Sequence, residues 1–134
     1  MKNSEIVASY VGLINLVEKK EKYPVKFSFA ITRNLKTLES LNKDFETERN
    51  KLLDIYNVKD ADGEPAYKET GKIEIAAEQE ENWKKDMEEL LDIDVDVKVH
   101  KVSLADMDGI NITAEDMLAC SFMITELEQE VPYV

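Results

Sequence analysis

The sequence predicts an α+β fold in which one long helix and two or three shorter helices pack on a small antiparallel sheet. Apolar residues recur at helical spacing over most of the chain, and residues 92–102 alternate between apolar and polar as a strand does. A second extended pair, within about 66–75, flanks a glycine turn and completes the predicted sheet. The length of 134 residues is close to the commonest domain size, so we expect a single domain over 1–134.

Helical spacing of apolar residues marks four segments, at about 4–20, 24–57, 77–91 and 114–127. Within the second segment, a stripe of large apolar residues repeats every seven positions: Ile31, Leu38, Phe45 and Leu52. Residues 23–29 also alternate as a strand would, but Phe27 continues the helical stripe and favours a helix. Thr113 has a side chain suited to capping the last helix.

The long helix is too long for its apolar side chains all to be buried in one compact domain. At 1.5 Å per residue it spans roughly 50 Å, whereas a compact domain of this size is only about 36 Å across. Either the helix bends, or its far end packs on a second chain through Phe45, Leu52 and Ile55. We expect the second arrangement, a homodimer; the alternative is that the helices at 77–91 and 114–127 cover these residues within one chain.

Acidic residues gather around the predicted strand. Asp92, Asp94 and Asp96 share its polar face at the spacing of alternate strand residues, and Glu88 and Glu89 precede it. Such a row holds a divalent cation only if a second element adds ligands; the preferred interpretation is a solvated face that discourages edge pairing. These five residues are also the predicted acidic surface for contact with a protein partner.

The charge distribution restricts the partners. The net charge is −12; residues 1–56 carry a net of +2 and residues 57–134 a net of −14. An acidic half repels nucleic acid and anionic lipid, so we expect neither direct nucleic-acid binding nor membrane binding. No apolar run approaches the roughly 20 residues that span a bilayer, and no signal peptide is evident. With one cysteine, these features predict a cytoplasmic protein.

No catalytic, cofactor or metal site is predicted. Two loops approach the calcium-binding EF-hand pattern: Asp60-x-Asp62-Gly63 with Glu69, and Asp106-x-Asp108-Gly109 with Glu115. Their first ligand positions hold Val58 and Leu104, and neither loop has the flanking pair of helices, so both are interpreted as turns. His100 and Cys120 would form a nucleophilic pair only if the fold joined them, and a lone cysteine in an apolar helix is more typical of a core.

Three stretches resemble a family of small uncharacterised phage and prophage proteins. They are Tyr23–Ser28 with Arg33–Lys36, Glu88–Leu91 with Val99–Val102, and Ile112–Leu118 with Phe122–Ile124. The resemblance covers most of the chain, but its motifs carry no chemistry and the family has no assigned activity. It implies a viral origin and a site of action in the bacterial cytoplasm, and no functional residue is transferred from it.

These observations predict a non-enzymatic, phage-encoded binding protein that inhibits a host or anti-phage defence protein through its acidic surface. Two other classes remain open at this point. One is a virion structural or assembly protein, which would self-associate through the long helix. The other is an enzyme with an unrecognised site, which needs a pocket lined by convergent polar groups. The tail at about 128–134 contains Pro132 and is expected to fray.

Overall fold

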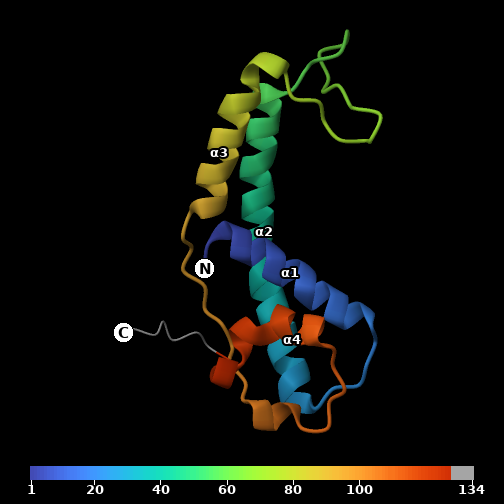
Figure 1. Ribbon diagram of the computed structural model, residues 1–134, viewed down its shortest axis with the longest axis vertical. Coiled ribbons are helices and arrows are strands. Elements are labelled where there is room, and N and C mark those ends of the chain that lie inside the picture. Colours follow the sequence, from blue (N-terminus) through green and yellow to red (C-terminus); the bar gives the residue numbers. More distant parts are fainter. Residues whose placement is uncertain (128–134) are drawn as a thin grey trace.

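The computed structural model describes residues 1–127, so the tail predicted to fray lies outside the described residues. Helices dominate it (Figure 1). Its α-helices are α1 (Asn3–Glu18), α2 (Val25–Tyr56), α3 (Glu80–Asp92) and α4 (Ala114–Cys120). Short 3-10 turns occur at Ala77–Gln79, Leu104–Met107, Ser121–Met123 and Thr125–Leu127. Within residues 1–127, no helix is both long and apolar enough to cross a membrane.

The predicted antiparallel sheet is wrong. In the described part of the chain, β-pairing is limited to isolated bridges. Residues 92–102 are extended, but they pair only through single bridges, Lys2 with Asp94 and Val102 with Ile124. Residues 66–75 lie at the opposite end of the molecule (Figure 1), so the two predicted sheet segments never meet. The valine alternation is real, because an extended chain lying on helices buries every second side chain just as a strand does.

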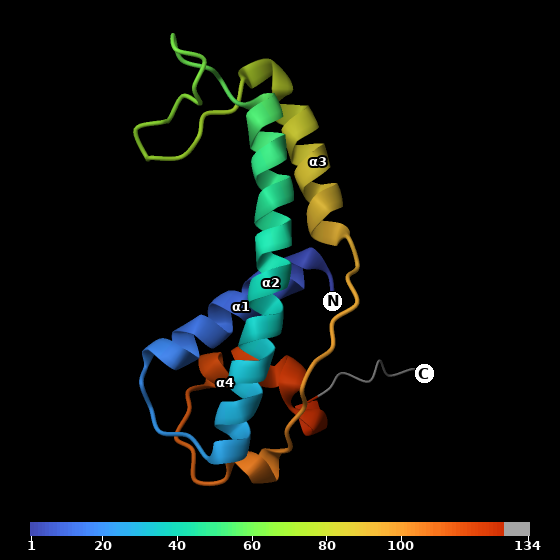
Figure 2. The same cartoon turned by 180° about the vertical axis from the view of Figure 1, so that it is seen from behind.

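The long helix α2 runs the length of the molecule. Its first half lies in a lobe with α1 and α4, and its second half forms an antiparallel hairpin with α3 (Figures 1 and 2). At the far end, the Tyr56 hydroxyl donates to Asp86, and its ring packs edge-on against Trp83 with centroids 6.4 Å apart. Cover for the overhanging half of α2 is therefore supplied by α3 of the same chain.

The core of the lobe lies between α1, the first half of α2 and the chain from Val102 onward. Its fully buried apolar side chains include Ile6, Leu13, Leu16, Phe27, Leu38, Cys120, Met123 and Ile124. A Cβ at Gly12 would lie 2.7 Å from the Cβ of Ala119, so only glycine allows α1 and α4 to approach this closely. Lys19, the residue that follows α1, forms an ion pair with the buried Asp116 of α4, and this hydrogen bond raises the pKa of Lys19.

The last helix is shorter than predicted. Thr113 caps α4 as expected, accepting a hydrogen bond from the Asp116 N–H at 3.1 Å, but α4 ends at Cys120 rather than near residue 127. The N–H of Val102 donates to the Met123 carbonyl and the Val102 carbonyl accepts from the Thr125 N–H, each at 2.8 Å. This parallel bridge holds Ile124 in extended conformation, so the chain beyond Cys120 forms two short 3-10 turns in place of a continued α-helix.

A side-chain amide fixes the extended segment to α2. Asn34, almost fully buried, donates from Nδ2 to the His100 carbonyl at 2.9 Å and accepts from the His100 N–H through Oδ1 at 2.7 Å. The amide thereby supplies the donor and acceptor that a neighbouring strand would otherwise provide. Residues 66 positions apart are joined by this pair, and the 93–102 segment is aligned along α2.

Residues 57–76 form an arm of three extended passes. The Val58 N–H donates to Glu74, that of Glu74 to Ala66, and that of Ala66 to Val58, so each pass bonds to the other two. Glycines at the two turns, Gly63 and Gly71, adopt φ of 79° and 85°, a conformation that favours glycine. The predicted turn at Thr70-Gly71 is confirmed, and the passes close on one another instead of joining a sheet.

Removing the Asn34 amide should destabilise the fold strongly. Asn34→Ala leaves the His100 N–H and carbonyl without their partners, so we expect the free energy of unfolding to fall by roughly 2–4 kcal/mol. Asn50→Ala, an exposed change in the same helix, should cost under about 0.5 kcal/mol. Urea denaturation measures both, and equal losses would show that the Asn34–His100 pair does not hold the segment.

Replacing Asn57, at the base of the arm, should stabilise the fold. Its side chain is buried, and neither amide atom has a hydrogen-bond partner within residues 1–127. An unpaired buried amide costs about 1–3 kcal/mol, so Asn57→Leu should raise the midpoint of thermal unfolding. Asn111→Leu, at an exposed position, is the control. A lower midpoint for Asn57→Leu would mean that the amide is satisfied.

Candidate functional site

An open hollow lies between the start of α1 and the end of α3. Its volume is about 590 Å³, and it is lined by Lys2, Ser4, Lys85, Glu88, Glu89, Leu91 and Asp92. The hollow brings together three residues of the predicted acidic surface, Glu88, Glu89 and Asp92. Glu88 and Glu89 occupy exposed positions on the last turns of α3 because Met87 and Leu90 take the positions that face α2.

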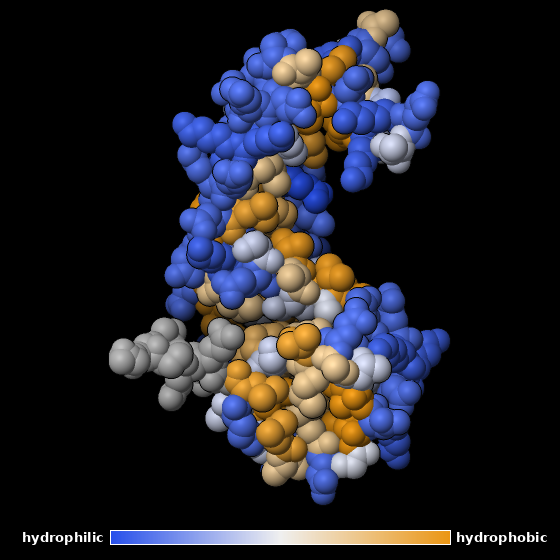
Figure 3. Space-filling model, in the orientation of Figure 1, coloured by the Kyte–Doolittle hydropathy of each residue, from blue (hydrophilic) through white to orange (hydrophobic). Residues whose placement is uncertain are grey.

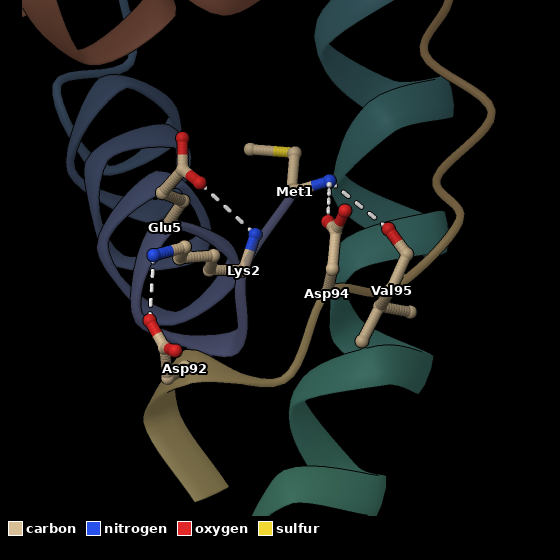
Figure 4. A network of polar contacts seen from close by, with 6 residues as sticks. All are labelled: Met1, Lys2, Glu5, Asp92, Asp94 and Val95. Carbon is tan, nitrogen blue, oxygen red and sulfur yellow. Dashed lines mark hydrogen bonds and ion pairs between the residues drawn. The ribbon is translucent and has the colours of Figure 1, made fainter. Parts of the chain in front are cut away.

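The first residues of the chain neutralise part of this acidic surface (Figure 4). Lys2 Nζ pairs with Asp92 Oδ1 at 2.5 Å, and this hydrogen bond raises the pKa of Lys2. The amine of Met1 lies 3.2 Å from Asp94 Oδ1 and donates to the Val95 carbonyl at 3.0 Å. Asp92 and Asp94 are therefore already paired within the chain.

The remaining acidic residues stay available to a partner. Glu88, Glu89 and Asp96 are exposed, and none has an ion pair within residues 1–127. In the same part of the chain, no group of three histidine, cysteine or acidic side chains is placed to hold a metal ion. The geometry offers a negatively charged face with separated carboxylates, which suits contact with a cationic surface.

The three predicted dimer contacts differ in their exposure to solvent. Phe45 is only 6% exposed, buried within its own chain. Leu52 is half-buried in a hollow between α2 and α3, whereas Ile55 is 67% exposed near the end of α2. A homodimer through this helix stays a prediction, and its contact would centre on Ile55.

Both calcium-like loops use their aspartates to hold turns. Asp60 Oδ1 accepts from the N–H groups of Asp62 at 2.9 Å and Glu64 at 3.0 Å. Asp106 Oδ2 accepts from the Ser103 N–H at 3.1 Å, and this bond lowers the pKa of Asp106. These bonds orient the two carboxylates toward their own backbone.

His100 and Cys120 do not form a pair. Cys120 is fully buried, burial raises the pKa of its thiol to about 11, and Sγ contacts the Met117 carbonyl. The exposed His100 ring stacks edge-on against Phe29, with centroids 5.3 Å apart. The thiol is consequently a core group, and the imidazole lies on the surface of the molecule against Phe29 of α2.

An apolar groove that sequence analysis missed lies beside the extended segment. Its volume is about 760 Å³, and its apolar lining consists of Met1, Val99, Met117, Leu118, Phe122 and Leu127. Figure 3 shows apolar side chains gathered on this lobe, in contrast to the polar rod above it. Leu118 belongs to the apolar pattern that predicts the last helix, yet its side chain is 75% exposed.

Comparison with known proteins gives no assignment, since no family model, no curated protein and no solved structure matches the chain. The resemblance to small phage and prophage proteins therefore depends on its motifs alone.

The two faces of the extended segment should respond differently to substitution. Val97 is half-buried, so Val97→Asp should lower the free energy of unfolding by about 1–3 kcal/mol. Asp94→Asn removes only a pair in which the Asp94 side chain is 84% exposed, and should cost under about 1 kcal/mol. Urea denaturation compares them, and equal effects would contradict the assigned faces.

Proposed function

We propose that the protein is a non-enzymatic binding protein whose acidic surface contacts a cationic surface of another protein. The observation that supports this most directly is the placement of Glu88 and Glu89. Both are exposed and without ion pairs among residues 1–127, on a hairpin that extends away from the lobe (Figure 1). Carboxylates in this setting speed encounter with a positively charged partner and fix its orientation.

The internal pairs define where the partner charge would fall. Lys2 and the Met1 amine compensate Asp92 and Asp94, so the uncompensated charge lies with Glu88 and Glu89 and, farther along, Asp96. α3 as a whole carries six acidic and two basic residues, which extends the negative field along its outer side. A partner helix or loop bearing lysine or arginine at a matching spacing fits this distribution.

The resemblance to phage and prophage proteins indicates the class of partner. A protein made during infection meets the host's own proteins in the bacterial cytoplasm, and blocking a host or defence protein requires binding but no chemistry. Proteins that bind nucleic acid present cationic surfaces to its phosphates. An acidic protein can occupy such a surface in place of the nucleic acid, which makes a nucleic-acid-binding protein the expected target.

Charge reversal tests the proposal. Partners are captured from bacterial host lysate on the immobilised full chain and identified by mass spectrometry, and their affinity is then measured with purified proteins. Glu88→Lys combined with Glu89→Lys should raise the dissociation constant at least about tenfold and flatten its dependence on salt. The control, Glu69→Lys with Glu74→Lys, makes the same charge change at exposed positions of the arm. It should change the dissociation constant less than about twofold.

Equal binding of the two charge-reversed proteins would reject the acidic surface as the contact. Circular dichroism of each variant establishes that it is folded before binding is compared.

A further inference from the structure

The extended segment from Ile93 to His100 leaves much of its backbone unpaired. Its valines, Val95, Val97 and Val99, are half-buried, and the residues between them point to solvent. Within residues 1–127, no hydrogen bond reaches the backbone N–H or carbonyl of residues 96–99. An extended chain with free backbone groups is a template for another strand.

The two edges of this segment differ. Backbone groups of successive residues in an extended chain point to opposite edges. One edge carries the groups of Ile93 and Val95, which bond to Asn3 and Met1. The other edge carries those of Asp94, Asp96 and Lys98, which have no partner in the described part of the chain, and it closes at His100, where Asn34 is bound.

We propose that this open edge pairs antiparallel with the same segment of a second copy, about a two-fold axis at Val97. In this register the N–H and carbonyl of Asp96 face those of Lys98 in the partner, and the symmetric pair repeats the contact. The free groups of both residues are then satisfied by four hydrogen bonds. The pairing ends where the edge is already bonded, at His100.

The charges of the segment match in this register alone. Each Asp96 lies opposite a Lys98, and each Val95 lies opposite a Val99. Directly opposed side chains in antiparallel strands are close enough for such pairs to stabilise and for like charges to destabilise. Parallel in-register pairing would instead place Asp94 and Asp96 against themselves, so the charge pattern favours antiparallel pairing between copies.

A two-fold contact also agrees with the commonest closed symmetry of homo-oligomers, in which the same patch on both copies meets itself. The contact is distinct from one through α2, because it leaves Ile55 untouched. It is also compatible with partner binding, since it uses Asp96 and leaves Glu88 and Glu89 free.

Sedimentation equilibrium of the full chain, up to about 100 μM, tests the pairing. We expect the wild type to dimerise in this range. Lys98→Asp places aspartate opposite Asp96 twice across the axis, and Asp96→Lys places lysine opposite lysine, so each change should weaken dimerisation at least about tenfold. Lys68→Asp, the same charge change at an exposed position of the arm, should leave dimerisation unaltered.

Mixing supplies the decisive comparison. Equimolar Lys98→Asp and Asp96→Lys proteins restore both opposite-charge pairs in a heterodimer, which should form although each protein alone stays monomeric. The double exchange, Asp96→Lys with Lys98→Asp, should dimerise as the wild type does. A wild type that is monomeric at about 100 μM would overturn the proposal, as would a mixture that stays monomeric or a dimer lost in Ile55→Glu and kept in Lys98→Asp.

Discussion

The paired hydrogen bonds between Asn34 and His100 are the constraint on which the lobe depends. They attach a segment without a β-sheet to the middle of a long helix, and the attachment determines what its two ends meet. Upstream, residues 93–95 lie where the first residues of the chain can bond to them; downstream, Val102 lies where Met123 and Thr125 bond to it. Because these contacts are backbone bonds with fixed geometry, a single buried amide sets the register of three chain segments.

The same constraint explains which parts of the fold could be predicted from the sequence. The spacing of Ile31, Leu38 and Phe45 predicts α2 to within a residue or two, because a continuous apolar stripe has one regular explanation. The valines of the extended segment predict burial correctly but not pairing, since alternation records which side chains are covered and not what covers them. Asn34 lies three residues after Ile31 and four before Leu38, so helical spacing places it on their buried face. The pattern thus indicates a buried polar side chain, but it does not reveal that its partner is His100.

The acidic surface was predicted as a set of residues and is organised by contacts that the sequence does not show. Glu88, Glu89 and Asp92 follow from their places on or beside one helix. The pairing of Lys2 with Asp92 joins residues 90 positions apart, and no local signal reports it. As a result, five carboxylates of similar appearance in the sequence differ in charge balance: two are compensated within the chain, and three remain for contacts outside it.

Free backbone edges normally invite indiscriminate pairing, and proteins commonly protect them with charge. A run of one sign would repel every strand of the same sign, including a second copy. The segment here instead carries Asp94 and Asp96 before Val97 and Lys98 after it, so the order of charges reverses when the chain direction reverses. Such an edge opposes parallel copies and admits antiparallel ones, because only the reversed strand places Asp96 against Lys98. In the proposed pairing, the same side chains protect the free edge from other strands and select a second copy.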